Sequence, residues 1–271
     1  DASDILGLEI AGIVETVGDR KNEHWIGQRV MGLVSGGGYA EYCAIDADCL
    51  IPIPYGWDFA MAAAVPEVFL TAHACLVELA QLQNGETILI HAGASGVGTA
   101  AIQMAAYRGA DVFFTTSSRE KIDKVMALGA KAGINYHSQD FVHEIKKFTY
   151  NKGVDVIMDF IGADYINQNI DCLKANGRLL LVAVLSGAKA EINLVPILRK
   201  RLQLKGMNLR HRSLGEKRIL IKDFLCHWMQ PLSRGYLIPV IDHVYKMNEV
   251  VKAHEHMEKN ANVGKIVLLM D

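Results

Sequence analysis

The feature that most constrains this chain is a regular alternation of short apolar strands and helical segments from about residue 60 to residue 184. Apolar runs such as TILIHA, DVFFTTS, VDVIMDF and RLLLVAV alternate with segments whose alanines and leucines recur at helical spacing. Such alternation predicts βαβ units, and therefore a parallel sheet with both faces covered by helices. The fold class that we expect is α/β, with a doubly wound parallel sheet.

The two ends of the chain follow patterns that differ from this middle region. Residues 5–53 are short apolar segments cut by glycine, namely ILGLEIAGIVETV, RVMGLV and YAEYCAI, and predict a small, largely antiparallel β unit. Residues 214–271 add an amphipathic helix, a strand IPVIDHVY, a helix from Met247 and a closing strand KIVLLM. These last strands have no place in the parallel sheet, so we expect them to find partners in the first unit.

This reasoning predicts two domains, of which the first is discontinuous. Residues 1–61 and 212–271 form a mainly β domain, and residues 62–211 form the domain with the parallel sheet.

Composition excludes several classes of function. The 28 basic and 30 acidic side chains give a formal charge of −2, which offers no electrostatic reason to expect nucleic acid or an anionic membrane surface as a partner. No apolar run approaches the roughly 20 residues of a membrane-spanning helix. The five cysteines include no CxxC pair, which fits a reduced cytoplasmic compartment.

A glycine-rich turn, HAGASGVGTAAIQ at residues 91–103, lies where a predicted strand ends and a helix begins. Gly93, Gly96 and Gly98 allow a tight turn, the approach of a pyrophosphate and close packing of helix on strand. The start of the helix offers free N–H groups and a positive dipole end. A turn needed only for packing is the alternative, but three glycines in six residues at this junction favour dinucleotide binding.

The next strand predicts which dinucleotide is bound. NAD sites carry an acidic residue about 20 residues after the glycines, on the ribose hydroxyls. Here the strand ends in TTSSR, followed by Glu120 and Lys121, and we expect Glu120 on the exposed first turn of a helix. Hydroxyls and cations suit a 2′-phosphate, so NADPH is favoured over NADH. SSREK is also a capping box, and the two interpretations are compatible.

With these features in hand, the chain resembles the zinc-free quinone oxidoreductases of the medium-chain dehydrogenase superfamily, relatives of zeta-crystallin, and within them the stress-inducible NADPH quinone reductase branch. The motifs are GLEIAGIVETVG, GQRVMGLVSGGGYAEY, AAAVPEVFLTA, GETILIHAGASGVGTAAIQMA and NVGKIVL, and the likeness covers essentially all 271 residues. Three positions depart from the commoner pattern: Ser95 in the turn, Gln28 and Ala106. None of them is expected to prevent cofactor binding.

The resemblance implies a Rossmann-type NADPH domain and a GroES-like catalytic domain that lacks a segment of about 60 residues before Asp1. If the chain is complete as given, we expect it to bind NADPH but to turn over quinones poorly. Substrate-facing residues are expected in that preceding segment, so no catalytic residue is assigned.

The resemblance also implies roles for particular residues. The pyrophosphate is held by the glycine turn, with Gly93, Ser95, Gly96, Val97 and Gly98, and the 2′-phosphate by the end of the next strand, with Ser117, Lys121 and Tyr136. The nicotinamide half is bordered by two later turns, with Ile161, Gly162, Leu185 and Ser186, and Thr71 lies near the nicotinamide ring. Three further residues close over the cofactor, namely Leu209, Arg210 and Asn262. Tyr136 could instead be an aromatic that shields the core, and Arg210 and Arg212 could belong to a solvated loop.

A catalytic zinc is not expected. Zinc alcohol dehydrogenases, relatives of this family, carry a His ligand in GHE, whereas this chain has Leu8 between Gly7 and Glu9, and leucine has no lone pair to donate. Glu9 is expected to be structural. His254 and His256 are two residues apart on a predicted helix and so point in different directions, which favours a surface role over a metal site.

Three functions stay open at this point. The first is an NADPH-dependent quinone reductase, the second a 2-enoyl thioester or alkenal reductase, and the third an NADPH-binding sensor or structural protein with little turnover. The resemblance further implies a homodimer with contacts near Glu191–Leu194.

Overall fold

The computed structural model describes residues 3–270, which divide into two compact units. Among these residues, unit 1 comprises 3–71 and 209–270, and unit 2 comprises Ala72–Asn208. The sequence-based boundaries, after residues 61 and 211, stay a prediction about domains. The outermost residues of that prediction, 1, 2 and 271, lie outside the described part.

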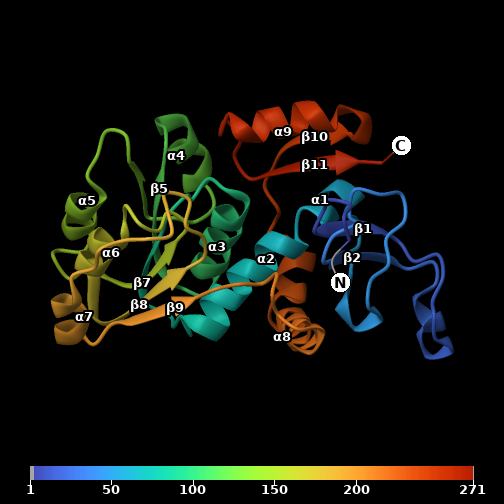
Figure 1. Ribbon diagram of the computed structural model, residues 1–271, viewed down its shortest axis with the longest axis horizontal. Coiled ribbons are helices and arrows are strands. Elements are labelled where there is room, and N and C mark those ends of the chain that lie inside the picture. The colour runs from blue at the N-terminus through green and yellow to red at the C-terminus, as the bar shows by residue number, and fades with distance from the viewer. Residues whose placement is uncertain (1–2, 271) are drawn as a thin grey trace. The chain divides into compact units, whose positions relative to one another are not determined.

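Unit 2 is built on a six-stranded parallel sheet in the order β6-β5-β4-β7-β8-β9. Figure 1 shows α5, α6 and α7 on one face of it and α3 and α4 on the other. The strands are β4 (Thr87–Ile90), β5 (Asp111–Thr116), β6 (Ala132–Asn135), β7 (Val154–Asp159), β8 (Leu173–Leu181) and β9 (Gln203–Gly206). The helices are the π-helix η3 (Ala74–Leu79), α3 (Gly96–Tyr107), α4 (Arg119–Met126), α5 (Phe141–Phe148), α6 (Ile166–Cys172) and α7 (Leu194–Lys200).

The sheet of unit 2 confirms the predicted βαβ alternation. Ile88 of β4 pairs with Val112 on one side and Val156 on the other, and all three side chains are fully buried. A strand buried on both faces must be apolar throughout, which is why these strands appear in the sequence as continuous apolar runs. The helix that we predicted from about Thr99 begins earlier, at Gly96, because the Ser95 side chain caps it.

Unit 1 contains an antiparallel sheet, β1-β2-β3, in which Glu9 pairs with Leu33. A capping box of Ser213 and Glu216 starts its helix α8. The elements are β1 (Glu9–Ile13), η1 (Arg20–Trp25), β2 (Arg29–Leu33), η2 (Ala47–Cys49), β3 (Leu50–Pro52), α1 (Phe59–Ala63), α2 (Pro66–His73, which crosses into unit 2), α8 (Leu214–Ser233), β10 (Ile241–Lys246), η4 (Met247–Glu249), α9 (Val250–Glu258) and β11 (Lys265–Leu269). Within residues 3–270, no helix combines the length and the apolar character needed to cross a bilayer.

The strand predicted for YAEYCAI, residues 39–45, is wrong. This segment has no regular secondary structure, because the backbone before it is taken up by a loop. The N–H groups of Gly37 and Tyr39 donate to the carbonyls of Ile5 and Leu6 at 2.7 and 2.9 Å. Gly36 and Gly37 have φ values of 134° and 87°, which twist the chain out of a strand conformation.

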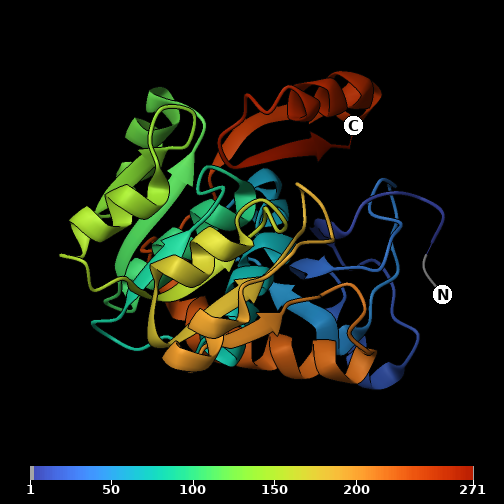
Figure 2. The same cartoon turned by 60° about the vertical axis from the view of Figure 1, so that its left-hand side comes forward.

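The expected partners of the two C-terminal strands are also wrong. In the described residues, β10 and β11 pair with each other in parallel and form a sheet of their own within unit 1, apart from β1-β2-β3. Parallel neighbours need a long crossover, and α9 supplies it by packing against both strands (Figure 2).

Candidate functional site

The glycine turn after β4 is shaped by contacts that a side chain would break. The Gly93 N–H donates to the Thr115 carbonyl at 2.9 Å, and a Cβ on Gly93 would come within 2.6 Å of the Phe114 ring. A Cβ on Gly98 would come within 2.4 Å of the Ala92 carbonyl oxygen. Both glycines are therefore required by close packing of strand, turn and helix.

The start of α3 leaves N–H groups available to an anion. The Ser95 hydroxyl accepts the Gly98 N–H at 3.0 Å. The N–H groups of Gly96 and Val97 belong to the first turn, where no intrahelical acceptor exists. Together with the positive end of the helix dipole, these groups can hold a pyrophosphate.

The position of this turn in the sheet is the usual position of a ligand site. From β4, the strand order runs outward through β5 and β6 on one side and through β7, β8 and β9 on the other. Open α/β sheets bind ligands outside the carboxyl ends of the strands, where the order reverses in this way. The turns after β4, β5 and β7 all lie at that edge.

The end of β5 presents hydroxyls and a buried lysine. The Ser118 side chain accepts the Lys121 N–H at 3.2 Å and caps α4, and Lys121 is 8% exposed. The Tyr136 N–H donates to the Thr116 carbonyl at 3.1 Å, which holds Tyr136 next to the strand end. Ser117 is half-buried between these elements. The structure thus brings the three residues predicted for the 2′-phosphate to one strand end.

Glu120, the nearest acidic residue, is exposed on the first turn of α4, as expected. Hydrogen bonds to its own backbone N–H and to Ser118 lower the pKa of its carboxyl.

The turn after β7 gathers the residues predicted for the nicotinamide half. The Ser186 hydroxyl donates to the Ile161 carbonyl at 2.9 Å, and the Ser186 N–H reaches the same carbonyl at 2.8 Å. Gly162 has a φ of 87° and forms an isolated bridge with Gly187. Leu185 is 77% exposed beside them. The turn after β7 and the segment after β8 that contains Ser186 are therefore held against one another, although they are far apart in sequence.

Asp159, which the sequence analysis missed, organises this turn. Its carboxylate is fully buried at the end of β7 and accepts the N–H of Ile161 at 2.7 Å and that of Gly162 at 3.2 Å. Burial raises the pKa of Asp159, while these N–H groups and the Asn169 amide act in the opposite direction. The signal in the sequence was the aspartate that ends the strand VDVIMD, which also contains Asp155.

His91 lies directly after β4 and connects it to β5 and to α6, the helix that follows the turn after β7; no role had been assigned to it. Its ring is hydrogen-bonded to the Thr115 hydroxyl at 3.0 Å and to the Asn169 amide oxygen at 2.7 Å. The rings of Phe141 and Tyr165 each pack against it in a T-shaped arrangement, with centroids 4.9 Å apart. Burial lowers the pKa of His91 to about 4, so it is neutral at ordinary pH.

The other predicted cofactor residues lie in unit 1. Thr71 and Leu209 are both 4% exposed, and Arg210 is exposed on the segment that leads to α8. The Asn262 amide donates to the Gly264 carbonyl at 3.0 Å and closes a tight turn. This local hydrogen bond is a structural reason for an asparagine at position 262.

Glu9 has the structural role that we expected. It pairs with Lys265, and its other oxygen accepts the Glu67 N–H at 2.9 Å, at the start of α2. Burial, and then the neighbouring Glu9, raise the pKa of the Glu67 carboxyl.

The two histidines of the HEH sequence have separate partners. His254 is hydrogen-bonded to the Tyr39 hydroxyl at 3.2 Å, whereas His256 contacts Tyr245 at 3.1 Å and Asp242 at 3.4 Å. Across residues 3–270, no group of three or more His, Cys, Asp and Glu side chains is arranged to hold a metal ion.

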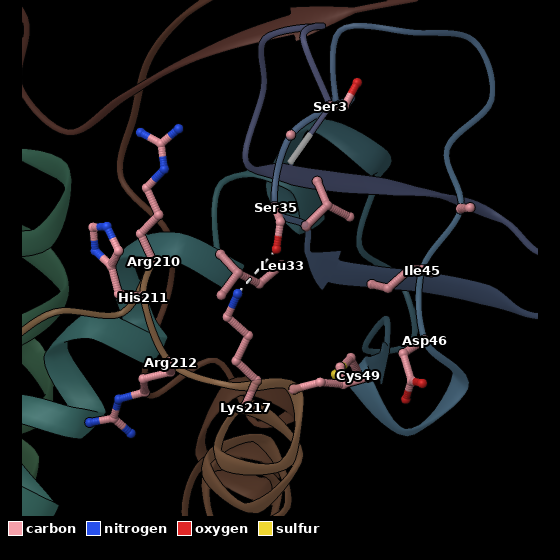
Figure 3. Close-up of a pocket in the computed structure, with 14 residues that line it drawn as sticks. Ser3, Leu33, Ser35, Ile45, Asp46, Cys49, Arg210, His211, Arg212 and Lys217 are labelled. Carbon is pink, nitrogen blue, oxygen red and sulfur yellow. Dashed lines mark hydrogen bonds between the residues drawn. The ribbon is translucent and has the colours of Figure 1, made fainter. Parts of the chain in front are cut away.

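Unit 1 also contains a cavity of about 600 Å³. Residues from the end of β2 and from η2 form one part of its wall, and residues 210–217 form another. Figure 3 shows Lys217 reaching from α8 to Ser35, with Arg210 and His211 on one side of it and Ile45 on the other. The cavity is large enough for a small organic molecule.

The chain matches two family models. The alcohol dehydrogenase GroES-like domain matches residues 2–55, and the zinc-binding dehydrogenase model matches residues 96–220.

The chain is also similar to individual proteins along most of its length. It is 32% identical to a quinone oxidoreductase of Sus scrofa over 266 residues, covering 97% of this chain and 79% of the relative. Among solved structures, the CurK enoyl reductase superposes with a TM-score of 0.86 at 30% identity, covering 98% of this chain and 79% of the other. The quinone oxidoreductase of Thermus thermophilus, solved also in complex with NADPH, has a TM-score of 0.81 at 29% identity, covering 97% and 79%.

Proposed function

We infer the function from one premise: the chain belongs to the medium-chain dehydrogenase superfamily, with a Rossmann-type domain and a GroES-like domain. It is therefore an oxidoreductase of the kind that uses a nicotinamide cofactor. We propose that the cofactor is NADPH, that the acceptor is a quinone, and that no zinc takes part.

The end of β5 is the observation that carries the choice of NADPH. An NAD site would place a carboxylate on the ribose hydroxyls at this strand end. Here Ser117, Lys121 and Tyr136 lie around the strand end instead, and Lys121 is buried, at 8% exposure. A fixed cation with neighbouring hydroxyls favours a 2′-phosphate.

The residues of unit 2 would then bind and orient the cofactor. The first turn of α3 would hold the pyrophosphate, and the turn fixed by Asp159 would border the nicotinamide half. The bound cofactor supplies the hydride. A quinone is already strongly electron-accepting, so positioning it can suffice without a Lewis acid.

The zinc-free part of the proposal rests on Leu8. One of the matched families is described as zinc-binding, yet Leu8 replaces the histidine that would be a ligand, and its neighbour Glu9 is engaged by Lys265 and the Glu67 N–H. We expect quinone reduction to be unchanged after dialysis against a strong zinc chelator. Loss of activity that zinc restores would contradict this part.

An enoyl reductase is the second candidate, and the CurK enoyl reductase favours it as strongly as the quinone oxidoreductases favour the first. Steady-state assays with an ortho-quinone and with a 2-enoyl thioester separate the two. Turnover of the quinone supports our choice, and turnover of the thioester alone overturns it. Tight NADPH binding with oxidation by neither acceptor would support the third function, a binding protein.

We also propose a homodimer through unit 2. β9 is an edge strand, and the neighbouring α7 exposes Leu194 at 69% and Leu198 at 79%. Exposed apolar side chains beside an unpaired strand edge are typical of an association surface. Sedimentation as a dimer is expected, and a Leu198→Glu variant should shift it to the monomer. A wild-type chain that sediments only as a monomer would contradict the proposal.

The thiols support our proposal of a cytoplasmic location. Within residues 3–270 no disulfide joins the cysteines, and burial raises the pKa of Cys172 to about 12, which makes its thiol inert. Proteins whose cysteines form no disulfides are typical of a reducing compartment.

A further inference from the structure

The cavity of unit 1 has an apolar wall and a cationic wall. Leu33, Val34, Ala44 and Ile45 contribute the apolar wall. Arg210, His211, Arg212 and Lys217 come from one short segment and contribute the cationic wall. In Figure 3 the Lys217 side chain points toward Ser35, whereas the Arg212 side chain points away from Lys217. An acceptor with an uncharged body needs only the first of these walls, so the second requires a separate explanation.

The positive charge of the wall is not offset by the acidic residue that also lines the cavity. Asp46 is bound by Arg218, which does not line the cavity, through contacts of 3.0 Å to Nε and 2.5 Å to Nη2. The hydrogen bond from Arg218 lowers the pKa of Asp46, so this carboxylate stays ionised and paired. The charge of Asp46 is thereby neutralised from outside the cavity.

The Lys217 side chain extends from α8 and places its ammonium group beside Ser35, just after the end of β2. It is half-buried, and its Nζ donates to the Ser35 hydroxyl at 3.1 Å, a neutral partner. Its positive charge also acts on Glu67 and Cys49, lowering the pKa of each against the larger effect of burial. Among residues 3–270, Lys217 and Arg210 form no ion pair within 4.0 Å. A half-buried ammonium with a single neutral partner can accept an anion at little cost in desolvation.

We propose that this cavity binds the anionic group of an acceptor with an apolar body, so that the preferred substrates carry a sulfonate, carboxylate or phosphate. The inference rests on the proposed function, because it names the substrate class of that reaction. The volume of about 600 Å³ accommodates a fused aromatic ring system or an acyl chain together with such a group.

Direct binding tests this without any need for turnover. Isothermal titration with anthraquinone-2-sulfonate compares the wild type, Lys217→Gln and Lys222→Gln. Lys222 lies on the same helix, is exposed and does not line the cavity, so its variant controls for the loss of one positive charge. We expect Lys217→Gln to weaken binding about fivefold and Lys222→Gln to weaken it less than about twofold, because a partly exposed charge pair is modest in strength.

Titrations at two ionic strengths, and competition with inorganic phosphate, show what kind of anion the cavity binds. The difference between the two variants should shrink when ionic strength rises from about 0.01 M to about 0.5 M. Equal binding to both variants at low salt would overturn the proposal. Competition by inorganic phosphate as strong as that of the sulfonated quinone would also overturn it, since the site would then recognise a free anion rather than an acceptor.

Turnover of matched acceptors separates this inference from the proposed function. The pairs are a naphthoquinone with its sulfonate, and a neutral enoyl thioester with the corresponding coenzyme A thioester. In whichever pair is reduced, Lys217→Gln should lower kcat/KM for the anionic member about fivefold more than for the neutral one. Turnover of the thioesters alone would contradict the quinone proposal and leave the anion preference measurable. An unchanged ratio would refute the anion preference while the quinone activity stands.

Arg210 needs its own measurement, because we also propose it as a cofactor residue. If it serves the acceptor, Arg210→Gln should raise the KM of the anionic acceptor more than that of NADPH. If only the KM of NADPH rises, Arg210 does not belong to the anion wall, and the proposal loses one of its two unpaired cations.

Discussion

The turns after β4 and β7 lie beside each other at one edge of the same sheet, yet they are held by different means. The turn after β4 is fixed by close packing around Gly93 and Gly98, with a hydroxyl cap from Ser95. The turn after β7 is fixed by the buried carboxylate of Asp159, which accepts two backbone N–H groups. The first leaves its N–H groups open to a ligand, whereas the second uses its N–H groups internally.

This difference indicates what each turn can do. Open N–H groups at a helix start can bind an anion, so the turn after β4 is suited to a pyrophosphate. A turn whose N–H groups are already satisfied can only present a surface of fixed shape, which suits the flat nicotinamide half. His91, directly after β4, is hydrogen-bonded to Asn169 of α6, the helix that follows the turn after β7, so damage to one turn is expected to reach the other.

The largest effect is expected from Gly98→Ala. The new Cβ would lie 2.4 Å from the Ala92 carbonyl oxygen and 2.7 Å from the Gly93 Cα, both backbone atoms that cannot move without opening the turn. We expect a loss of about 3 to 5 kcal/mol in the free energy of unfolding and loss of cofactor binding.

Gly215→Ala is the matched control. Gly215 is also a helical glycine, and a Cβ there meets nothing within 4 Å. Denaturant titration should show this variant as stable as the wild type or up to about 1 kcal/mol more stable. Equal stability of both variants would refute the packing account of the turn after β4.

Acid should affect the buried connection between the turns. The pKa of His91 is lowered from 6.5 to about 4, so between these values the unfolded chain binds a proton that the folded chain does not. The free energy of unfolding therefore falls as pH drops from 6.5 and levels off below about 4, by up to about 3 kcal/mol in total.

The variant His91→Gln should lose this part of the pH dependence, which thermal unfolding at a series of pH values would show. An NMR titration in which the His91 ring protonates near pH 6.5 in the folded protein would contradict the account.

A smaller effect is expected from the carboxylate of the turn after β7. Asp159→Ala leaves the N–H groups of Ile161 and Gly162 buried without an acceptor and should cost about 2 kcal/mol. Asp159→Asn keeps one acceptor oxygen and should recover about half of that loss. Hydrogen exchange at these two amides gives the local readout. If Asp159→Ala leaves both amides as protected as in the wild type, the carboxylate does not hold the turn.

Most of unit 2 could be predicted from the sequence, because buried parallel strands leave continuous apolar runs and the glycine turn has a fixed spacing. Unit 1 was harder. YAEYCAI has the composition of a strand, but three preceding glycines place its backbone in a loop. The parallel pairing of β10 with β11 depends on α9 as a crossover, which an apolar pattern alone does not reveal.

The candidate site was predictable only in part. Gly93, Gly98 and Lys121 belong to motifs whose chemistry is local, so their strand ends could be placed. Asp159 and His91 act through backbone groups and through residues distant in sequence, and no spacing marks them. The cationic wall of the unit 1 cavity likewise needs folding, which brings residues 210–217 next to the end of β2.

The central claim is that the cofactor is NADPH. The effect of Lys121→Ala on cofactor affinity, which is the smallest of the expected effects, tests this claim most directly. Neither turn distinguishes NADPH from NADH, because pyrophosphate and nicotinamide are common to both, so the choice depends on the end of β5. The measurement is the ratio of the Kd values for NADH and NADPH, by fluorescence titration, in the wild type and in Lys121→Ala. We predict a wild-type preference for NADPH, and a loss of about tenfold in NADPH affinity in the variant, equivalent to about 1.4 kcal/mol, with little change for NADH. Preference of the wild type for NADH, or equal weakening of both cofactors in the variant, would contradict the account.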